Sequence, residues 1–331
     1  MQGAIGGMRS WDLVSLASVL RAFRMDLVLL DEGGPKVDLR STRLEDALVC
    51  TVETGARFRG RFELPRGWGL FGFVHSPGLN DSWCHGIGLV AGTALWLGPG
   101  GVSEFFLDEG ARLTLVLVPA ARMDRALASA GRSGDAEGLQ APGPLLCRSQ
   151  PEARRLCGLY WRLRASMLGG QGPRGMGVDE LLQAHMDWMG AGEAASRPPF
   201  PRGRRGYYLL AQRAEAYMRA HMREDVSIED VCRACQVSER NLRYAFEQMM
   251  RVSPKRYLSM LRLCAACQSL LTAASGRRSV RAVALACGMW DLSRFADSYR
   301  RVFGELPSQT LVRAPAARPA VARRRATAAV A

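Results

Sequence analysis

The chain of 331 residues has no apolar run long enough to cross a bilayer. Its N-terminal apolar stretch, Leu13 to Leu30, is interrupted by charged residues, whereas a spanning helix needs about 20 apolar residues. The interrupting residues are Arg21, Arg24 and Asp26. The N-terminus also lacks the basic start and small-residue cleavage site of a secretory signal peptide. We therefore expect a cytoplasmic protein with no membrane partner.

Histidine is scarce, and the motifs of common active sites are missing. Only four histidines occur, and none is paired with a nearby carboxylate at a recognisable metal-ligand spacing. No glycine-rich phosphate loop or nucleophile motif is present, since Gly98-Pro99-Gly100-Gly101 indicates a turn. His75 and Trp83-Cys84-His85 leave a metal-dependent cupin enzyme open, but packing roles are favoured. We expect no enzyme activity, no cofactor and no metal.

The nine cysteines do not follow the spacing of a disulfide framework, which predicts free thiols. Two CxxC pairs, Cys232/Cys235 and Cys264/Cys267, are nevertheless the pattern of structural zinc. Both pairs fall inside predicted helices, where cysteine also serves as a small buried residue. A zinc- or thiol-redox-responsive regulator therefore stays open as an alternative.

Positive charge is in excess, and it is unevenly distributed. The formal net charge is +14. Residues 1–195 carry 20 Lys/Arg against 21 Asp/Glu, whereas residues 196–331 carry 25 against 10. Such asymmetry is typical of a domain that faces phosphates, because basic side chains release condensed counterions there. A solvated basic surface is the simpler interpretation unless a binding motif accompanies the charge.

A helix-turn-helix pattern that begins at Ser227 recurs 52 to 53 residues later. The matched apolar positions are Ile228, Val231, Cys232, Leu242 and Phe246 in the first copy and Val280, Val283, Ala284, Phe295 and Tyr299 in the second. The second turn holds one extra residue near Gly288, and glycine suits a tight turn because positive φ costs it nothing. Pro254 and Pro307 close the two copies, since proline cannot continue a helix interior.

Residues 207–312 resemble the DNA-binding domain of the AraC/XylS family of bacterial transcription regulators. The matching segments are Ser253-Pro254-Lys255-Arg256-Tyr257-Leu258 with Leu261-Arg262, and Val283-Ala284-Leu285-Ala286-Cys287-Gly288 with Phe295, Tyr299-Arg300-Arg301 and Phe303-Gly304. The chain departs from the family at Arg251, where glycine is usual, and at Met289, where phenylalanine is usual. The resemblance implies two helix-turn-helix units joined by a long helix, with double-stranded DNA and RNA polymerase as partners.

In each unit the second helix is expected to enter the major groove of DNA. We predict these helices at residues 238–250, with Ser238 as N-cap, and 291–302. Their inward stripes are Leu242, Ala245, Phe246 and Met249 in the first and Phe295 and Tyr299 in the second. The predicted base-reading residues are Arg240, Asn241, Arg243, Tyr244, Leu292, Ser293, Arg294 and Asp297.

Each of these side-chain types suits a particular base edge. Arginine forks match guanine, asparagine matches adenine, and Leu292 suits a thymine methyl group. For Asp297, an i,i+3 ion pair with Arg294 is favoured over a contact to cytosine. Phosphate contacts, which position the protein without specifying sequence, are predicted for Arg251, Lys255, Arg277, Arg278, Arg300 and Arg301.

A helix from Pro254 to about Ala273 would be about 30 Å long, close to the ~34 Å repeat of the duplex. It would hold both reading helices in successive major grooves on one face of the DNA. A monomer would then read a long asymmetric site.

The N-terminal part has the pattern of a β-rich domain that follows a helix at residues 10–24. Apolar runs separated by glycine and proline predict strands at 47–52, 57–64, 69–74, 93–97 and 113–118. Their spacing suggests a small sandwich or barrel, such as the cupin-like sensor domain of many family members, which makes the fold class α+β. The candidate effector-binding residues are Trp68, Phe71, Phe73 and Trp83, although aromatic residues on strands are more often core.

We divide the chain into a sensor domain at 1–130, a linker and helical region at 131–206, a DNA-binding domain at 207–312 and a disordered basic tail at 313–331. Helices predicted at 151–168 and 178–190 either pair subunits in a homodimer or pack within the chain. The predicted function is sequence-specific transcription regulation. An activator controlled by a small-molecule effector or a protein partner is favoured.

Overall fold

The computed structural model describes residues 25–34, 37–130, 143–146, 151–169, 175–190, 203–272 and 279–313. The predictions of a helix at 10–24, of most of the linker and of the basic tail fall outside these residues. Arg277 and Arg278 also lie outside them.

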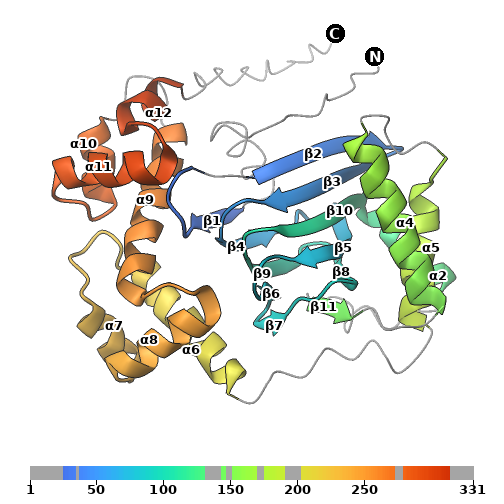
Figure 1. Ribbon diagram of the computed structural model, residues 1–331, viewed down its shortest axis with the longest axis horizontal. Helices are drawn as coiled ribbons and strands as arrows, with labels where there is room; N and C mark the ends of the chain where they lie inside the picture. The colour runs from blue at the N-terminus through green and yellow to red at the C-terminus, as the bar shows by residue number, and fades with distance from the viewer. Residues whose placement is uncertain are drawn as a thin grey trace, which may run out of the picture.

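Two antiparallel sheets face each other in the N-terminal part (Figure 1). Sheet A contains, in spatial order, β1 (Asp26–Leu29), β4 (Phe58–Glu63), β9 (Val102–Leu107), β6 (Trp83–Cys84) and β7 (Ile87–Gly88). Sheet B contains β11 (Gly143–Leu146), β8 (Thr93–Leu97), β5 (Trp68–Pro77), β10 (Ala111–Pro119), β3 (Ala47–Thr54) and β2 (Val37–Leu44). The five predicted strands are confirmed as β3, β4, β5, β8 and β10.

Strand β10 shows why sheet B is apolar on both faces. Leu113 and Leu117 point toward sheet A, whereas Val116 and Val118 point to the opposite face and are fully buried. Successive side chains of a strand alternate between faces, so a strand covered on both sides becomes a continuous apolar run. The remaining strands were not predicted, because they are short or interrupted by polar residues: β1, β2, β6, β7, β9 and β11.

Three helices cover the outer face of sheet B: α2 (Ala120–Ser129), α4 (Pro151–Leu168) and α5 (Val178–Gly190) (Figure 1). Helices α4 and α5 confirm the predicted elements at 151–168 and 178–190, while α2 was not predicted. Their apolar faces, including Leu156 and Leu181, form one core with Phe71, Phe73 and Val116 of the sheet. The helical region and the β-sheets therefore share a core, and a domain boundary at residue 130 stays a prediction.

The C-terminal part is all helical. Its elements are α6 (Arg204–Ala220), α7 (Ile228–Cys235), α8 (Glu239–Met250), α9 (Pro254–Thr272), α10 (Val280–Ala286), α11 (Leu292–Phe303) and α12 (Pro307–Arg313). The pairs α7/α8 and α10/α11 are the two predicted helix-turn-helix units, and α9 joins them (Figure 1). With 19 residues, α9 is about 28 Å long. The fold is therefore α+β, as predicted.

Polar caps start both units at corresponding places. The Ser227 hydroxyl accepts a hydrogen bond from the Asp230 amide in a capping box, and Ser279 caps α10. Ser238 is confirmed as the N-cap of α8, with its hydroxyl 3.3 Å from the Asn241 amide, and Asp291 caps α11. These side chains satisfy amides that have no partner within the helix.

Left-handed residues end α8 and α11 at equivalent positions of the repeat. Arg251 has φ 55° and Gly304 has φ 77°. Arg251 thus adopts the conformation that explains why glycine is usual at this place. Gly288 in the second turn has φ 72°, and a Cβ there would overlap the Met222 carbonyl oxygen. The prediction of a glycine-dependent turn is confirmed.

Gly288→Ala should destabilise the protein by at least about 3 kcal/mol, because positive φ and the overlap with Met222 act together. Gly304→Ala is the matched control: it has positive φ but no atom within 4 Å, so about 1–2 kcal/mol is expected. Urea unfolding of both variants measures the difference. Equal losses would mean that the contact with Met222 is unimportant.

Candidate nucleic-acid interface and effector cavity

Helix α8 separates its inward and outward residues as predicted. Leu242, Ala245 and Phe246 are fully buried. The four predicted base-reading residues are all exposed: Arg240, Asn241, Arg243 and Tyr244. They lie in the first two turns of α8, and the N-terminal end is the one that enters the groove in helix-turn-helix proteins.

Two of these side chains already have partners within α8. Arg243 forms an ion pair with Glu239 at 3.1 Å, with both side chains more than half exposed. The Arg240 guanidinium lies 5.5 Å from the centre of the Tyr244 ring, a cation–π distance. An exposed pair of this kind is weak, so DNA can replace it. Stacking on Tyr244 restricts the orientation of the Arg240 side chain.

Helix α11 is the second helix of the other helix-turn-helix unit. Phe295 and Tyr299 are buried, and the Tyr299 hydroxyl hydrogen-bonds to Thr310 at 2.9 Å. The four predicted base-reading residues are exposed on its N-terminal half: Leu292, Ser293, Arg294 and Asp297. The expected ion pair between Arg294 and Asp297 is wrong, because these two described side chains form none within 4.0 Å. Both extend into solvent, where such a pair would gain little.

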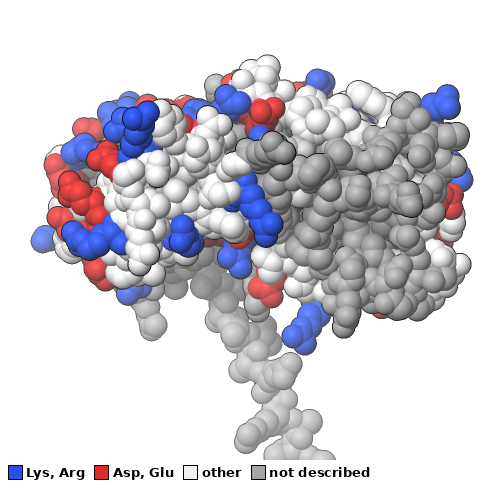
Figure 2. All heavy atoms as spheres, turned by 90° about the horizontal axis from the view of Figure 1, so that it is seen from below, with Lys and Arg blue, Asp and Glu red and all other residues white. Residues whose placement is uncertain are grey.

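Four predicted phosphate-binding residues are exposed: Arg251, Lys255, Arg300 and Arg301. Figure 2 shows basic and acidic side chains interleaved over the helical end of the molecule. Within the C-terminal residues that the structure describes, 17 basic residues stand against 10 acidic ones. The remaining excess lies in the segments outside them. The described surface therefore has a moderate positive charge.

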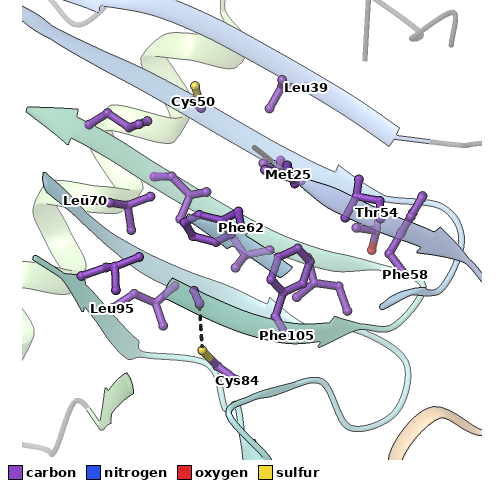
Figure 3. Close-up of a pocket in the computed structure, with 18 of the residues that line it drawn as sticks. Met25, Leu39, Cys50, Thr54, Phe58, Phe62, Leu70, Cys84, Leu95 and Phe105 are labelled. Carbon is purple, nitrogen blue, oxygen red and sulfur yellow. Dashed lines mark hydrogen bonds between the residues drawn. The ribbon is translucent and has the colours of Figure 1, made fainter. Parts of the chain in front are cut away.

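A cavity of about 200 Å³ lies between the two sheets. Figure 3 shows Phe62 and Phe105 of sheet A and Leu70 and Leu95 of sheet B pointing into it. None of its lining residues is charged. The Thr54 hydroxyl in its wall already hydrogen-bonds to the Asp108 carbonyl at 2.5 Å. The wall offers apolar surface and little else.

The prediction of effector-binding residues is wrong for this cavity, since Trp68, Phe71, Phe73 and Trp83 are all absent from its lining. Leu70 enters the cavity, so its neighbours on β5 face the other way. There Phe73 stacks on Tyr160 of α4 with ring centres 5.1 Å apart, and Phe71 lies in the same core.

The other two aromatic residues also have different partners. Trp68 is half-buried at the start of β5, next to a small apolar cluster. Trp83 lies on the outer face of sheet A, and its indole Nε1 donates to the Met249 carbonyl of α8 at 2.6 Å. Trp83 therefore belongs to the contact between the β-sheets and the helices.

Sheet A packs directly on the helical domain. Val28 of β1 and Phe106 of β9 are buried in the same core as residues of α8 and α9. The Leu29 amide donates to the Cys264 sulfur of α9 at 3.3 Å. The neighbouring side chain Leu27 lines the cavity instead. Strand β1 thus borders the cavity through Leu27 and the helical domain through Val28, and Figure 1 shows it beside α9.

A buried ionic cluster centres this contact. Arg59 of β4 forms ion pairs with Glu104 of β9 and Glu215 of α6, each at 3.0 Å. Glu215 also pairs with Arg219 at 2.8 Å and accepts a hydrogen bond from the Tyr257 hydroxyl at 2.6 Å. Arg59 and Glu215 are less than one-tenth exposed. Charges are tolerated there because each has several partners.

The stability of the contact between the two domains depends on pH through the carboxylates of this cluster. Burial raises the pKa of Glu215, but Arg59 and Arg219 outweigh burial and hold that pKa below its usual value. Its contribution to stability is therefore complete above the unfolded pKa near 4.5 and is lost as pH falls through the lowered pKa. Asp26, which pairs with Arg219, shows the opposite pKa shift, because burial raises the pKa of its carboxyl group.

The structure does not bring together the histidines of a metal-dependent cupin enzyme, nor does it favour the cysteines as zinc ligands. His75 hydrogen-bonds to Thr114 at 2.9 Å on sheet B, whereas the His85 ring accepts from the Glu104 amide at 3.3 Å on sheet A. Burial raises the pKa of the Cys264 and Cys267 thiols to about 12, which disfavours thiolate ligands. Across the described ranges, no group of three His, Cys, Asp or Glu side chains is arranged to hold a metal ion. None of the helices in these ranges is long and apolar enough to cross a membrane.

Residues 231–313 match the family described as a helix-turn-helix domain. One similar protein, the XylDLEGF operon transcriptional activator of Pseudomonas putida, is 31% identical over 120 residues, or 36% of each chain. A probable thc operon regulatory protein of Rhodococcus erythropolis is 30% identical over 106 residues, or 32% of each chain. The chain thus matches about a third of the length of these curated relatives.

Similar solved structures include the AraC-like transcriptional activator CuxR, at 20% identity, with a TM-score of 0.39 over 75% of this chain and 88% of that one. A probable AraC family regulator from Rhodopseudomonas palustris is 34% identical over 32% of this chain and 97% of its own, with a TM-score of 0.30. The C-terminal helices form a double helix-turn-helix DNA-binding domain. In sequence, this domain is of the AraC/XylS type.

Arg59→Met should destabilise the protein by about 3–5 kcal/mol, because Glu104 and Glu215 would remain buried without the guanidinium. Adding Glu215→Gln should recover part of this loss. Arg243→Met is a suitable control, since Arg243 and its partner Glu239 are both more than half exposed and about 1 kcal/mol or less is expected. Urea unfolding at pH 7 measures all three. Similar losses of stability in Arg59→Met and Arg243→Met would contradict the role of burial.

Proposed function

We propose that this protein is a sequence-specific regulator of transcription that binds double-stranded DNA with α8 and α11. The observation that carries the proposal is the pairing of two helix-turn-helix units, each with polar and basic side chains exposed on the first half of its second helix. One such helix fits the major groove, and α9 is nearly as long as one turn of the duplex. A single chain would contact two successive grooves. No catalytic step is part of this proposal.

Activation of transcription is the favoured direction of regulation. The Pseudomonas putida relative carries the description of an operon transcriptional activator. RNA polymerase is then the protein partner, because an activator on a nearby site acts by recruiting or stabilising the polymerase. Base contacts from Arg240, Asn241 and Arg294 would specify the site, while Lys255 and Arg300 would hold phosphates.

The effector that we propose is a small uncharged apolar molecule in the cavity between the sheets. A charged ligand would lose its hydration there and find no charged partner, which is strongly unfavourable. The cavity of about 200 Å³ is somewhat larger than an apolar cavity of about 150 Å³ that is known to accept benzene. A single ring with short alkyl substituents therefore fits its size and chemistry.

Helix α4 supports a homodimer. Its inner face is buried on sheet B, but an outer stripe stays exposed: Gly158, Trp161, Ala165 and Leu168. These residues follow the alternating spacing of three and four that lets two helices pack along one seam. Trp161 is 54% exposed, which is costly for so large an apolar side chain in an isolated subunit. Two copies would then place two reading domains on one promoter.

Arg240→Ala and Arg294→Ala should each weaken binding to the specific site by about 1–3 kcal/mol while changing nonspecific affinity little. Lys255→Ala is the control, since loss of a phosphate contact should weaken specific and random DNA alike. Genomic fragments selected by the purified protein supply the site, and titrations at constant salt supply the affinities. Equal losses on specific and random DNA would show that both arginines contact phosphate only.

Toluene should raise the Tm of the protein, and benzoate, which carries a carboxylate on the same ring, should not. Leu39→Trp should abolish the effect of toluene by filling the cavity from the edge strand β2. Thr42→Trp, on the same strand but outside the lining, should retain it. A higher Tm with benzoate, or with toluene in Leu39→Trp, would show that this cavity is not the binding site of an apolar effector.

A further inference from the structure

The β-sheet domain donates hydrogen bonds to the C-terminal ends of both reading helices. Trp83 Nε1 donates to the Met249 carbonyl of α8 at 2.6 Å, and the Gly34 amide donates to the Val302 carbonyl of α11 at 2.8 Å. Met249 and Val302 are 53 residues apart, which is the offset of the repeat after its turn. The same carbonyl of each copy is therefore bound by the other domain. A carbonyl in the last turn of a helix has no partner within the helix, which makes it available.

Arg57 and Asp31 connect these two attachments. Arg57 Nη1 donates to the Arg251 carbonyl at the end of α8, at 3.1 Å. The same guanidinium pairs with the Asp31 carboxylate, whose Oδ2 also accepts from the Arg57 amide at 2.8 Å. Two residues after Asp31, the Gly33 amide donates to the Arg301 carbonyl of α11 at 2.8 Å. We call the four residues Asp31, Gly33, Gly34 and Arg57 the brace.

The backbone of the brace depends on its glycines. Gly33 has φ 96° and Gly34 has φ 90°, a conformation that other residues adopt only with strain. It turns two consecutive amides toward the end of α11. Asp31 then holds this turn against Arg57 and sheet A. The brace is thus a continuous, well-bonded path from the end of α8 to the end of α11.

The brace leaves the proposed DNA-binding residues uncovered. Arg240 and Asn241 on α8, like Ser293 and Arg294 on α11, are exposed while the β-sheet domain is docked. They lie on the halves of the two helices that point away from the bound carbonyls. The contact therefore does not bury the base-reading side chains. What it constrains is the position of one reading helix relative to the other.

We propose that the brace sets the spacing between the two DNA half-elements that the protein accepts, with Asp31 and Arg57 as positioning residues. This inference rests on the proposed function. One added base pair moves a half-element by about 3.4 Å and rotates it by about 35° around the duplex axis. Helix α9 alone can bend gently over its length, and the turn at Gly288 lies against Met222 and Arg262, far from the C-terminal ends of α8 and α11 that the brace binds. The brace adds a second, bonded connection at the other ends of the reading helices.

The test compares affinities for the selected site with duplexes whose spacer is shortened or lengthened by one or two base pairs. The wild-type protein should prefer the selected spacing over its neighbours by about tenfold or more, the size of effect that one wrong base pair has. The double variant Asp31→Asn/Arg57→Gln should lose less than about tenfold in affinity for the selected site. Its affinities for the selected spacing and the neighbouring spacings should differ by about threefold or less. Asp46→Asn, which alters an ion pair with Arg122 far from α8, is the matched control.

A second variant, Trp83→Phe, keeps an aromatic ring but removes the indole Nε1 donor to Met249, which is the other bond between sheet A and the end of α8, so it tests the same constraint if the double variant fails to fold. Unchanged spacing preference in both variants would overturn the proposal and leave α9 and the Met222 contact as the determinants. Equal loss of affinity at every spacing would also overturn it, because the residues would then serve stability alone. If the wild-type protein selects no DNA sequence, the proposed function itself is wrong. This outcome differs from the two above, in which the wild-type protein still selects a sequence.

Discussion

The buried contact between Arg59 and Glu215 is the interaction on which the arrangement of this molecule depends. A guanidinium and a carboxylate that have left water must remain together, since separating them strands a charge in an apolar contact. Arg59 belongs to a strand of sheet A and Glu215 to α6. Their pairing therefore fixes the position of the β-sheet domain relative to the DNA-binding domain. In this position Trp83, β1 and the brace can make their contacts with the helices.

Strand β1 lies between the cavity and the helical domain and contacts both. It is a single strand, yet Leu27 borders the apolar cavity and Val28 is buried against α8 and α9. Any molecule that fills the cavity presses on the same strand that the helices pack against. Because interiors are packed as densely as crystals, such a displacement is transmitted rather than absorbed. The loop that follows β1 holds three residues of the brace, Asp31, Gly33 and Gly34, so the cavity wall, β1 and the ends of α8 and α11 form a contiguous series.

Local patterns predicted much of this molecule. The duplicated apolar spacing located both helix-turn-helix units, Ser238 was recognised as a cap, and the outward residues of α8 and α11 are exposed as expected. The cavity residues could not be obtained in that way. Alternation along β5 shows that Leu70 and Phe71 face opposite sides, but both sides are buried and apolar. Which side encloses a cavity depends on how the second sheet and α4 pack.

The sequence by itself determined the two-unit DNA-binding domain, because helix period, caps and positive-φ turns depend on residues a few positions apart. Only the tertiary structure decided the partners of Arg59, Trp83 and Asp31. Their contacts join residues far apart in the chain, such as Trp83 with Met249, and no spacing in the sequence encodes them. Long-range hydrogen bonds and ion pairs of this kind arise once the apolar faces of separate elements have packed. In this protein they connect the cavity to the helices proposed to bind DNA.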